Sequence, residues 1–331
     1  METPGAGTHA ALIAHLRAVF KKELELYPQF NTEWNLLRYC KARKHNTKKV
    51  ERMLREYFEW RSRKKIDCVL ARPKEHFKPL ADVHEAGLYG TTRSGNPIMI
   101  ERLGFSNIKT ILNPQYDVMR EDYLLRTYER ILTVVFPIAS RTAGRRIDQL
   151  FIIYDMRNIN TAKLFDPKFQ RFLKAMTTTV QSYYPELLGK LFVVNANLLV
   201  KSVWAIVRPW IDAKTRSKIE IHAGIPTEAL VEHVDIGQLP DFLGGQNTVA
   251  LKDDHGPWRY YLNKAIEDGD LGLGDNTPEL DYFYTKDERE ALLHHQKTIS
   301  SLQLINRSNF EDTTHVNNVR SIRPAFLSGQ N

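Results

Sequence analysis

Residues 183–224 constrain the fold most, because they place two apolar runs on either side of a helix-length segment. The first run, 191–194, is short and rich in β-forming residues, which is typical of a buried strand. Residues 198–212 are long enough for a helix, and 219–221 fit a second short strand. A strand-helix-strand order predicts two parallel strands joined by a crossover helix.

The predicted crossover helix is unusual because it is apolar on almost all of its faces, although it carries Lys201 and Arg208. A helix on the surface of a sheet normally shows one polar face to water, whereas apolarity on every side indicates burial. The pattern on its own therefore indicates a crossover helix that is buried between the sheet and the N-terminal helices.

Three helical patterns precede this region. Apolar residues recur at helical spacing over 10–25, and further helices are predicted to start at Asn31–Thr32 and at Asn46–Thr47. Together they predict a small N-terminal helical bundle. The proline-containing segment 66–80 is interpreted as a connector.

The pattern changes at residue 97. Residues 97–103 alternate as a strand, and 150–154 form an apolar run that ends at Asp155. One intervening helix is expected from Asn113–Pro114 to just before Pro137, and another starts at Asp166–Pro167. Strands that alternate with helices predict an α/β fold with a largely parallel sheet.

These patterns divide the chain into three parts. Residues 1–80 are expected to form the N-terminal helical subdomain and 81–250 the α/β domain. Residues 251–331 are interpreted as a partly irregular C-terminal extension, with a short helix over 286–304.

Positive charge is concentrated in one segment. The formal net charge is +8, and residues 38–65 hold twelve Lys and Arg against three Glu, a local net charge of +9. Such a block indicates an anionic partner, which can be nucleic acid, an acidic membrane or a phosphorylated ligand, or else a solvated helical face. The two cysteines, Cys40 and Cys68, match no disulfide framework or metal motif, and no apolar run reaches roughly eighteen residues. A cytoplasmic location is expected.

Motifs of known catalytic sites are largely missing. The sequence has no glycine-rich phosphate loop, Ser106 lacks the second glycine of a nucleophile elbow, and His84–Glu85 lacks the second histidine of a zinc-protease motif. His294 and His295 are adjacent, so they point different ways on a helix. We therefore expect no enzyme activity, no metal and no cofactor.

Six stretches of the sequence form an ordered set: LLRYCKARKHNTKKVERMLREYFEWR (36–61), GNPIMIERLG (95–104), FPIASRTAG (136–144), YYPELLGKLFVVNA (183–196), IDAKTRSKI (211–219) and LPDFLGG (239–245). The first resembles the N-terminal subdomain of the CRAL-TRIO lipid-binding family, and the other five resemble its lipid-binding domain. They are most similar to the phosphatidylinositol/phosphatidylcholine transfer branch. The resemblance spans residues 31–245 and implies a cytosolic, cofactor-free protein with a deep apolar pocket, floored by the sheet and closed by a helical gate.

In that branch, the phosphoinositide headgroup is held by positions that match Arg43, Lys44, Glu186, Thr215 and Lys218 in this sequence. The chemistry suits this role. Arg43 offers a bidentate fork, while Lys44 and Lys218 are point charges for a phosphate. Thr215 adds a hydroxyl donor, and Glu186 can accept hydrogen bonds from inositol hydroxyls. Arg43–Lys44 alone would fit a solvated surface pair, but its presence with Glu186 and Lys218 favours a headgroup site.

One departure concerns phosphatidylcholine. Where the branch has a serine, a threonine and nearby tyrosines, this chain has Leu150 and Ile152, with Met99 and Val134 in place of two tyrosines. An unpaired buried polar group costs about 1–3 kcal/mol, so apolar side chains disfavour a phosphocholine there. We expect phosphatidylinositol binding to be kept and a more apolar, sterol-like second ligand to replace phosphatidylcholine. Plain core packing of these four residues is the alternative.

The resemblance also gives the apolar helix a role as the gate. Its residues expected to cover acyl chains are Leu198, Leu199, Val203, Trp204, Val207 and Ile211. Trp204 or Trp210 is expected to meet the bilayer when the gate opens, since tryptophan prefers that interface. Lys201 and the basic N-terminal block are expected to attract anionic lipid, by roughly 1 kcal/mol per charge.

The sequence therefore predicts a monomeric phosphatidylinositol-binding transfer protein that makes transient contacts with anionic membranes. A carrier of another apolar ligand (sterol, tocopherol-like or retinoid-like), with the basic residues used only for docking, is the neighbouring alternative. A nucleic-acid-binding protein is a remote alternative, because Tyr57, Phe58 and Trp60 follow the core stripe and form no exposed stacking platform. A hydrolase using Ser106 is the weakest.

Overall fold

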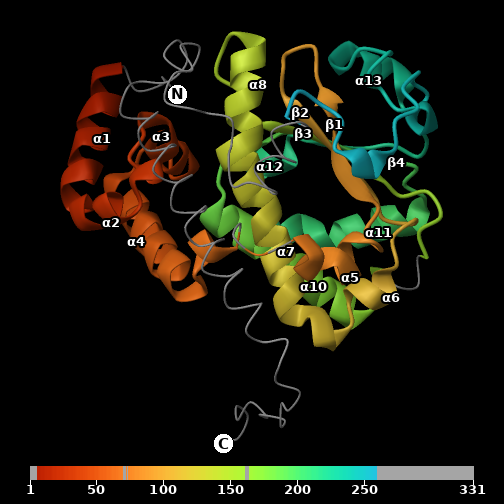
Figure 1. Ribbon diagram of the computed structural model, residues 1–331, viewed down its shortest axis with the longest axis horizontal. Coiled ribbons are helices and arrows are strands. Elements are labelled where there is room, and N and C mark those ends of the chain that lie inside the picture. Colours follow the sequence, from red (N-terminus) through yellow and green to blue (C-terminus); the bar gives the residue numbers. More distant parts are fainter. Residues whose placement is uncertain (1–5, 70–71, 73, 161–163, 259–331) are drawn as a thin grey trace, which may run out of the picture.

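A computed structural model describes residues 6–69, 72, 74–160 and 164–258 of the chain (Figure 1). The N-terminal part is helical, and its elements are α1 (Ala6–Val19), α2 (Lys21–Leu26), η1 (Pro28–Phe30), α3 (Glu33–Ala42) and α4 (Thr47–Lys64). The short elements η2 (Ile66–Cys68), η3 (Lys74–Phe77) and α5 (Lys78–Ala81) connect this part to the sheet.

Side-chain caps fix the first residues of two predicted helices, α3 and α4. The Thr32 hydroxyl accepts from the Asn35 amide (3.1 Å), and the Asn46 side chain accepts from the Lys49 amide (3.0 Å), so α3 and α4 begin where predicted. The helix expected over 10–25 is divided instead. Its break lies at Phe20, a fully buried side chain that packs near Phe58 of α4.

The described residues form a five-stranded sheet in the order β1 (Ala86–Thr91), β2 (Pro97–Arg102), β3 (Leu150–Asp155), β4 (Leu188–Val194) and β5 (Ile219–Ile221). Strands β2 to β5 are parallel, as predicted, whereas β1 pairs antiparallel with β2. The sequence pattern missed β1. Its Gly87 interrupts the apolar alternation, and a Cβ there would lie 2.1 Å from the Leu251 carbonyl oxygen, so the strand needs glycine for this close approach.

Different helices cover the two faces of the sheet (Figure 1). One face packs against α13 (Thr227–His233), η7 (Asp241–Leu243) and η8 (Leu251–Asp253), through a core that includes Ile98, Ile100, Phe151, Ile153 and Phe192. The opposite face looks toward α10 (Pro167–Tyr183) and α11 (Leu198–Val207). The remaining elements of this part are α6 (Ile108–Ile111), η4 (Pro114–Tyr116), η6 (Arg208–Trp210) and α12 (Ala213–Arg216).

The helix expected to end before Pro137 continues past it. Helix α7 (Asp117–Arg130) passes through one π-helical segment, η5 (Ile131–Val135), into α8 (Phe136–Ala143). A proline ring normally clashes with the carbonyl four residues earlier, and the wider π turn just before Pro137 relieves that contact. The predicted helix end before Pro137 was therefore wrong. The prediction treated proline as a helix stop, whereas the wider π-helical turn lets the helix continue past it.

The N-terminal helices share one continuous core with the cavity-side face of the sheet. Trp60 of α4 stacks on Tyr183 of α10, with ring centroids 3.9 Å apart. Tyr57, Phe58 and Trp60 are all at most 4% exposed, so these aromatic rings belong to the core, as their spacing predicted.

Residues 251–258 pack against the domain, since Leu251 and Trp258 are buried. The helix predicted over 286–304 lies outside the described residues. Among the residues that the structure covers, no helix is both long and apolar enough to span a membrane.

Candidate functional site: an apolar cavity with a charged mouth

A cavity of about 950 Å³ lies between the sheet and the helices α10 and α11. Its floor consists of alternate residues on three strands: Leu150, Ile152 and Tyr154 on β3, Leu191 and Val193 on β4, and Ile219 and Ile221 on β5. Its roof includes Phe169, Leu173 and Met176 of α10 and Val200, Val203 and Trp204 of α11. A cavity of this size lies at the upper end of the range for ligand pockets.

Helix α11 covers the cavity with one face and shows its other face to solvent. Of the six residues predicted to cover acyl chains, Val203, Trp204, Val207 and Ile211 line the cavity. Leu198 and Leu199 do not, because they are 80% and 47% exposed on the outer side. The helix is therefore not buried on all sides, and the interpretation of a crossover helix packed between two layers was wrong.

The helix is also shorter than the predicted 198–212. It ends at Val207, and the three-residue turn η6 follows, which contains Pro209. Asp212 then caps α12, a four-residue helix that the sequence pattern did not predict.

The five residues expected to hold a headgroup, Arg43, Lys44, Glu186, Thr215 and Lys218, all line this cavity. Lys41, Asp212 and Lys214 line it as well. We call the part of the cavity that these eight residues line the polar mouth. Three segments distant in sequence build it: the α3–α4 turn, the turn between α10 and β4, and α12 with the start of β5.

Buried polar contacts hold two of these segments together. The Tyr39 hydroxyl donates to the Tyr183 carbonyl (3.1 Å), and the Arg38 guanidinium donates to the Pro185 carbonyl (3.5 Å). Both residues lie on α3 and are almost fully buried. Because α3 leads directly into Arg43, these bonds fix the α3–α4 turn beside Glu186.

Both turns contain left-handed residues that are not glycine. Lys44 and His45 have φ of 51° and 57°, and Glu186 has φ of 64°. Such conformations cost of order 1 kcal/mol or more and are concentrated at functional sites. Here they occur at two of the five residues for which a binding role was predicted.

Lys218 lies deeper in the polar mouth than the other lysines. It is partly buried, and its Nζ donates to the Leu188 carbonyl oxygen. Burial lowers the pKa of Lys218, and the nearby charge of Lys214 lowers it further, whereas Glu186 acts in the opposite direction. Asp212 and Asp148 also act to raise this pKa, so burial is the main cause of its lowering. The ammonium lines the cavity and can bind an anion there.

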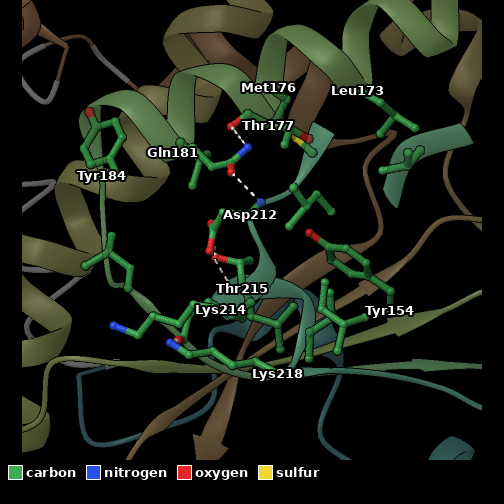
Figure 2. A pocket seen from close by; sticks show the side chains of 18 of the residues that line it. Tyr154, Leu173, Met176, Thr177, Gln181, Tyr184, Asp212, Lys214, Thr215 and Lys218 are labelled. Carbon is green, nitrogen blue, oxygen red and sulfur yellow. Dashed lines mark hydrogen bonds between the residues drawn. The ribbon is translucent and has the colours of Figure 1, made fainter. Parts of the chain in front are cut away.

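Asp212 organises the α12 side of the mouth (Figure 2). Its carboxylate accepts from the Thr215 amide (2.9 Å) and from the Thr215 hydroxyl (2.6 Å), while its own amide donates to Gln181 of α10 (3.2 Å). Burial alone would raise the pKa of Asp212, but these hydrogen bonds lower it overall. The Thr215 proton is therefore already engaged, and this hydroxyl offers a ligand its acceptor lone pairs.

Lys214 was missed by the sequence reasoning. Its Nζ lies 2.8 and 2.6 Å from the two carboxylate oxygens of Glu186, so the pair crosses the polar mouth. Lys214 directly precedes Thr215 in the stretch 211–219, and this adjacency was the available signal.

The four residues assigned to a second ligand are divided by the structure. Leu150 and Ile152 line the cavity floor. Met99 and Val134 are buried in the core behind the lining, at 6% and 4% exposure. Two phenols not foreseen there, Tyr128 and Tyr154, also line the cavity, and burial raises the pKa of both. Figure 2 shows the Tyr154 ring extending into the cavity.

The alternative sites from the sequence have structural roles. The Ser106 hydroxyl donates to the Arg102 carbonyl (3.1 Å) and accepts from the Glu85 amide (2.9 Å), so it stabilises a turn. No group of three or more potential metal ligands occurs among the residues that the structure describes. His294 and His295 lie outside those residues.

Sequence comparison identifies a CRAL/TRIO domain over residues 84–245. Two relatives from Arabidopsis thaliana are the phosphatidylinositol/phosphatidylcholine transfer proteins SFH12, 29% identical over 74% of this chain and 47% of its own length, and SFH13, 31% identical over 76% and 42%. The SEC14 cytosolic factor of Yarrowia lipolytica is 28% identical over 70% of this chain and 48% of its own length. The chain thus spans less than half of each of these relatives.

The crystal structure of Sfh5 has the same fold, with a TM-score of 0.58 at 14% identity, over 81% of this chain and all of that one. The two plant relatives are named as transfer proteins. Residues 84–245 match a CRAL/TRIO domain, and the chain is a distant homologue of Sec14-like proteins that are named as phosphatidylinositol/phosphatidylcholine transfer proteins.

Proposed function

We propose that the chain binds phosphatidylinositol in this cavity and carries it between membranes. One observation supports the proposal above all others: the five residues matched to a headgroup site line one end of a single cavity whose floor and roof are apolar. A lipid with a charged headgroup and long acyl chains matches such a cavity, because it is also polar at one end and apolar along the rest.

The polar mouth has the right groups for the headgroup. The Arg43 guanidinium and the Lys218 ammonium supply donors for the phosphodiester. Lys44 is exposed on the α3–α4 turn and adds a third positive charge. Glu186 accepts from inositol hydroxyls once Lys214 has released it, and Thr215 accepts through its free lone pairs.

The acyl chains extend below α10 and α11 and over the sheet. Apolar side chains of both helices and of three strands line this region, so burying the chains removes hydrocarbon from water at about 25 cal/mol per Å². That gain keeps the lipid with the protein between membranes.

Exchange requires α11 to move, because it forms part of the roof. Its outer face carries Leu198, Leu199 and Ile206, which are 80%, 47% and 37% exposed, together with the exposed Lys201. These residues suit a headgroup-level contact with an anionic bilayer. Membrane contact shifts the population toward an open gate. We place this cycle in a monomer that is cytoplasmic and only transiently peripheral, with no cofactor.

The second lipid is more apolar than phosphatidylcholine. Leu150 and Ile152 of the floor offer no hydrogen bond, so phosphatidylcholine binds weakly or not at all. The phenols Tyr128 and Tyr154 also line the cavity and supply one hydroxyl each. A sterol-like ligand with one small hydroxyl suits such a wall.

A lipid transfer assay tests the proposal. The double variant Lys44→Ala, Lys218→Ala is expected to lose phosphatidylinositol transfer from donor to acceptor vesicles. The matched control is Lys48→Ala, Lys49→Ala, which removes the same charge from exposed residues outside the cavity lining. Equal, mild effects of both double variants would instead support a carrier of another apolar ligand that uses its basic residues for docking. Tighter binding to RNA or DNA than to acidic vesicles would favour a nucleic-acid-binding protein.

A further inference from the structure

The polar mouth carries more positive charge than phosphatidylinositol can neutralise. Five cations line it, Lys41, Arg43, Lys44, Lys214 and Lys218, against the two carboxylates Glu186 and Asp212, a net charge of +3. A phosphodiester supplies a single negative charge. A charge of +2 is left over at the rim.

The Glu186–Lys214 ion pair indicates which of the positive charges needs a ligand anion. Lys214 contacts both carboxylate oxygens of Glu186, and Asp212 is engaged by the amide and hydroxyl of Thr215. When Glu186 turns to the inositol hydroxyls, Lys214 loses its anionic partner. A ligand that binds Glu186 through its ring hydroxyls therefore gains most if it also carries an anion for Lys214.

The cations also differ in depth. Lys218 is half-buried, beside the Leu188 carbonyl. Lys41, Lys44 and Lys214 are exposed, at the outer side. Figure 2 shows the side chains of Lys214 and Lys218 extending toward the same side of the cavity. A second phosphate on the inositol ring gives Lys214 and the other exposed cations an anionic partner of their own, which a single phosphodiester at Lys218 does not supply.

We propose that the preferred headgroup is a phosphorylated inositol, so that the cargo is a phosphatidylinositol monophosphate. Its phosphodiester binds Lys218 and Arg43. Its ring phosphate binds Lys214, Lys41 and Lys44. A phosphomonoester adds about −1.5 to −2 charge at neutral pH, which together with the phosphodiester matches the net charge of the polar mouth. This inference rests on the proposed function, because it uses the same cavity and the same Glu186 contact.

The source of the phosphates is a lipid and not a free inositol phosphate. The polar mouth opens directly onto the apolar part of the cavity, and a soluble headgroup would leave that part unused. Soluble inositol 1,4-bisphosphate is therefore expected to compete poorly with the lipid.

In the test, the 331-residue protein is mixed with vesicles that contain equal amounts of phosphatidylinositol and phosphatidylinositol 4-phosphate. Protein is then separated from the vesicles, and mass spectrometry measures the lipid that it has extracted, so electrostatic attraction to the vesicle surface does not count. We expect the phosphorylated lipid to be enriched by about tenfold, the size of one added charge-assisted contact. Parallel samples also contain soluble inositol 1,4-bisphosphate, equimolar with the phosphorylated lipid.

Two variants connect the result to the structure. Lys214→Met is expected to lower the enrichment to about twofold or less, and Lys214→Arg to preserve it. Lys48→Met, an exposed lysine outside the cavity lining, is the matched control and is expected to leave the enrichment unchanged.

Each outcome decides a different point. Extraction of phosphatidylinositol with no enrichment of the monophosphate overturns this inference and leaves the proposed function standing. Extraction of neither lipid overturns both. An enrichment that survives Lys214→Met overturns the ring-phosphate site, and displacement of the lipid by equimolar soluble bisphosphate overturns the lipid as its source.

Discussion

The Tyr184 hydroxyl donates a 2.8 Å hydrogen bond to Oε1 of Glu129, and this contact connects the cavity wall to the N-terminal helices. On its other side Glu129 pairs with Arg61 of α4 at 3.2 Å, and Arg61 also donates to the Tyr57 hydroxyl. Burial on its own would lower the pKa of Arg61, but the neighbouring Glu129, Tyr57 and Asp67 raise it well above its usual value. The guanidinium is charged, fully buried and dependent on Glu129.

Removing that carboxylate is expected to be costly. Glu129→Ala leaves Arg61 with only Asp67 as an anionic partner and should lower the free energy of unfolding by roughly 3–5 kcal/mol, measured by urea denaturation. The control Glu121→Ala removes the exposed partner of Lys64 and should cost at most about 1 kcal/mol. Equal losses in the free energy of unfolding for the two variants would show that the buried ion pair stabilises the protein no more than the exposed one.

Phosphatidylinositol binding should weaken at alkaline pH. The folded-state pKa of Lys218 is lowered, so this residue is charged below that pKa and becomes neutral as the pH rises through it, earlier than an ordinary lysine. Since the phosphodiester needs the charged form, binding is complete at neutral pH and falls as the pH rises. Binding measured from pH 7 to 10 checks this.

The control for the pH profile is Lys218→Arg, which stays charged throughout that range. We expect its binding to persist where the parent protein loses ligand. Identical profiles for the two proteins would mean that another group sets the pH dependence.

Hydroxyl groups on the cavity floor should allow the protein to bind and transfer phosphatidylcholine. The double variant Leu150→Ser, Ile152→Thr places two donors on the cavity face of β3, beside Tyr154. We expect phosphatidylcholine transfer to rise by about thirtyfold, because each of the two buried polar contacts contributes roughly 1 kcal/mol. The same changes on the opposite face, Phe151→Ser and Ile153→Thr, should destabilise the protein without this gain. Strong phosphatidylcholine transfer by the parent protein would contradict the premise.

We expect the outer face of α11 to affect the rate of lipid transfer, but not the amount of lipid that the purified protein holds. Leu198→Asp puts a negative charge on a residue that is 80% exposed, so folding and the lipid content of the purified protein should be unchanged. Repulsion from an anionic bilayer should slow transfer severalfold, measured with vesicles that contain phosphatidylserine. Val118→Asp on α7, an equally exposed apolar residue at 73%, is the matched control and should transfer at the parent rate. A similar loss in both variants would point to a general charge effect.

Local chemistry made much of the fold predictable. Thr32, Asn46 and Asp166 all cap the helices predicted to start there, because a cap depends on a side chain and an amide only two or three residues away. The parallel strands were readable for the same reason, since they are short, apolar and separated by helical patterns. Such signals lie within one segment of chain.

What escaped prediction depends on tertiary structure. The π turn before Pro137 and the β1 strand around Gly87 break local rules, and each is stabilised by packing from elsewhere. In the polar mouth, a family resemblance located Glu186 and Lys218, but no pattern announced that Lys214 would pair with Glu186, 28 residues away in sequence. Tyr154 was read as the end of a strand, and only the alternation of β3 placed its ring in the cavity.

The alternation of β3 has a consequence for how such chains diversify. Leu150, Ile152 and Tyr154 touch the cavity, while Phe151 and Ile153 pack beneath α13. Mutations at every second position can therefore change the cargo without disturbing the packing that keeps the domain folded. A single substitution at one of these positions alters the shape or polarity of the cavity floor, while the residues on the opposite face keep their packing.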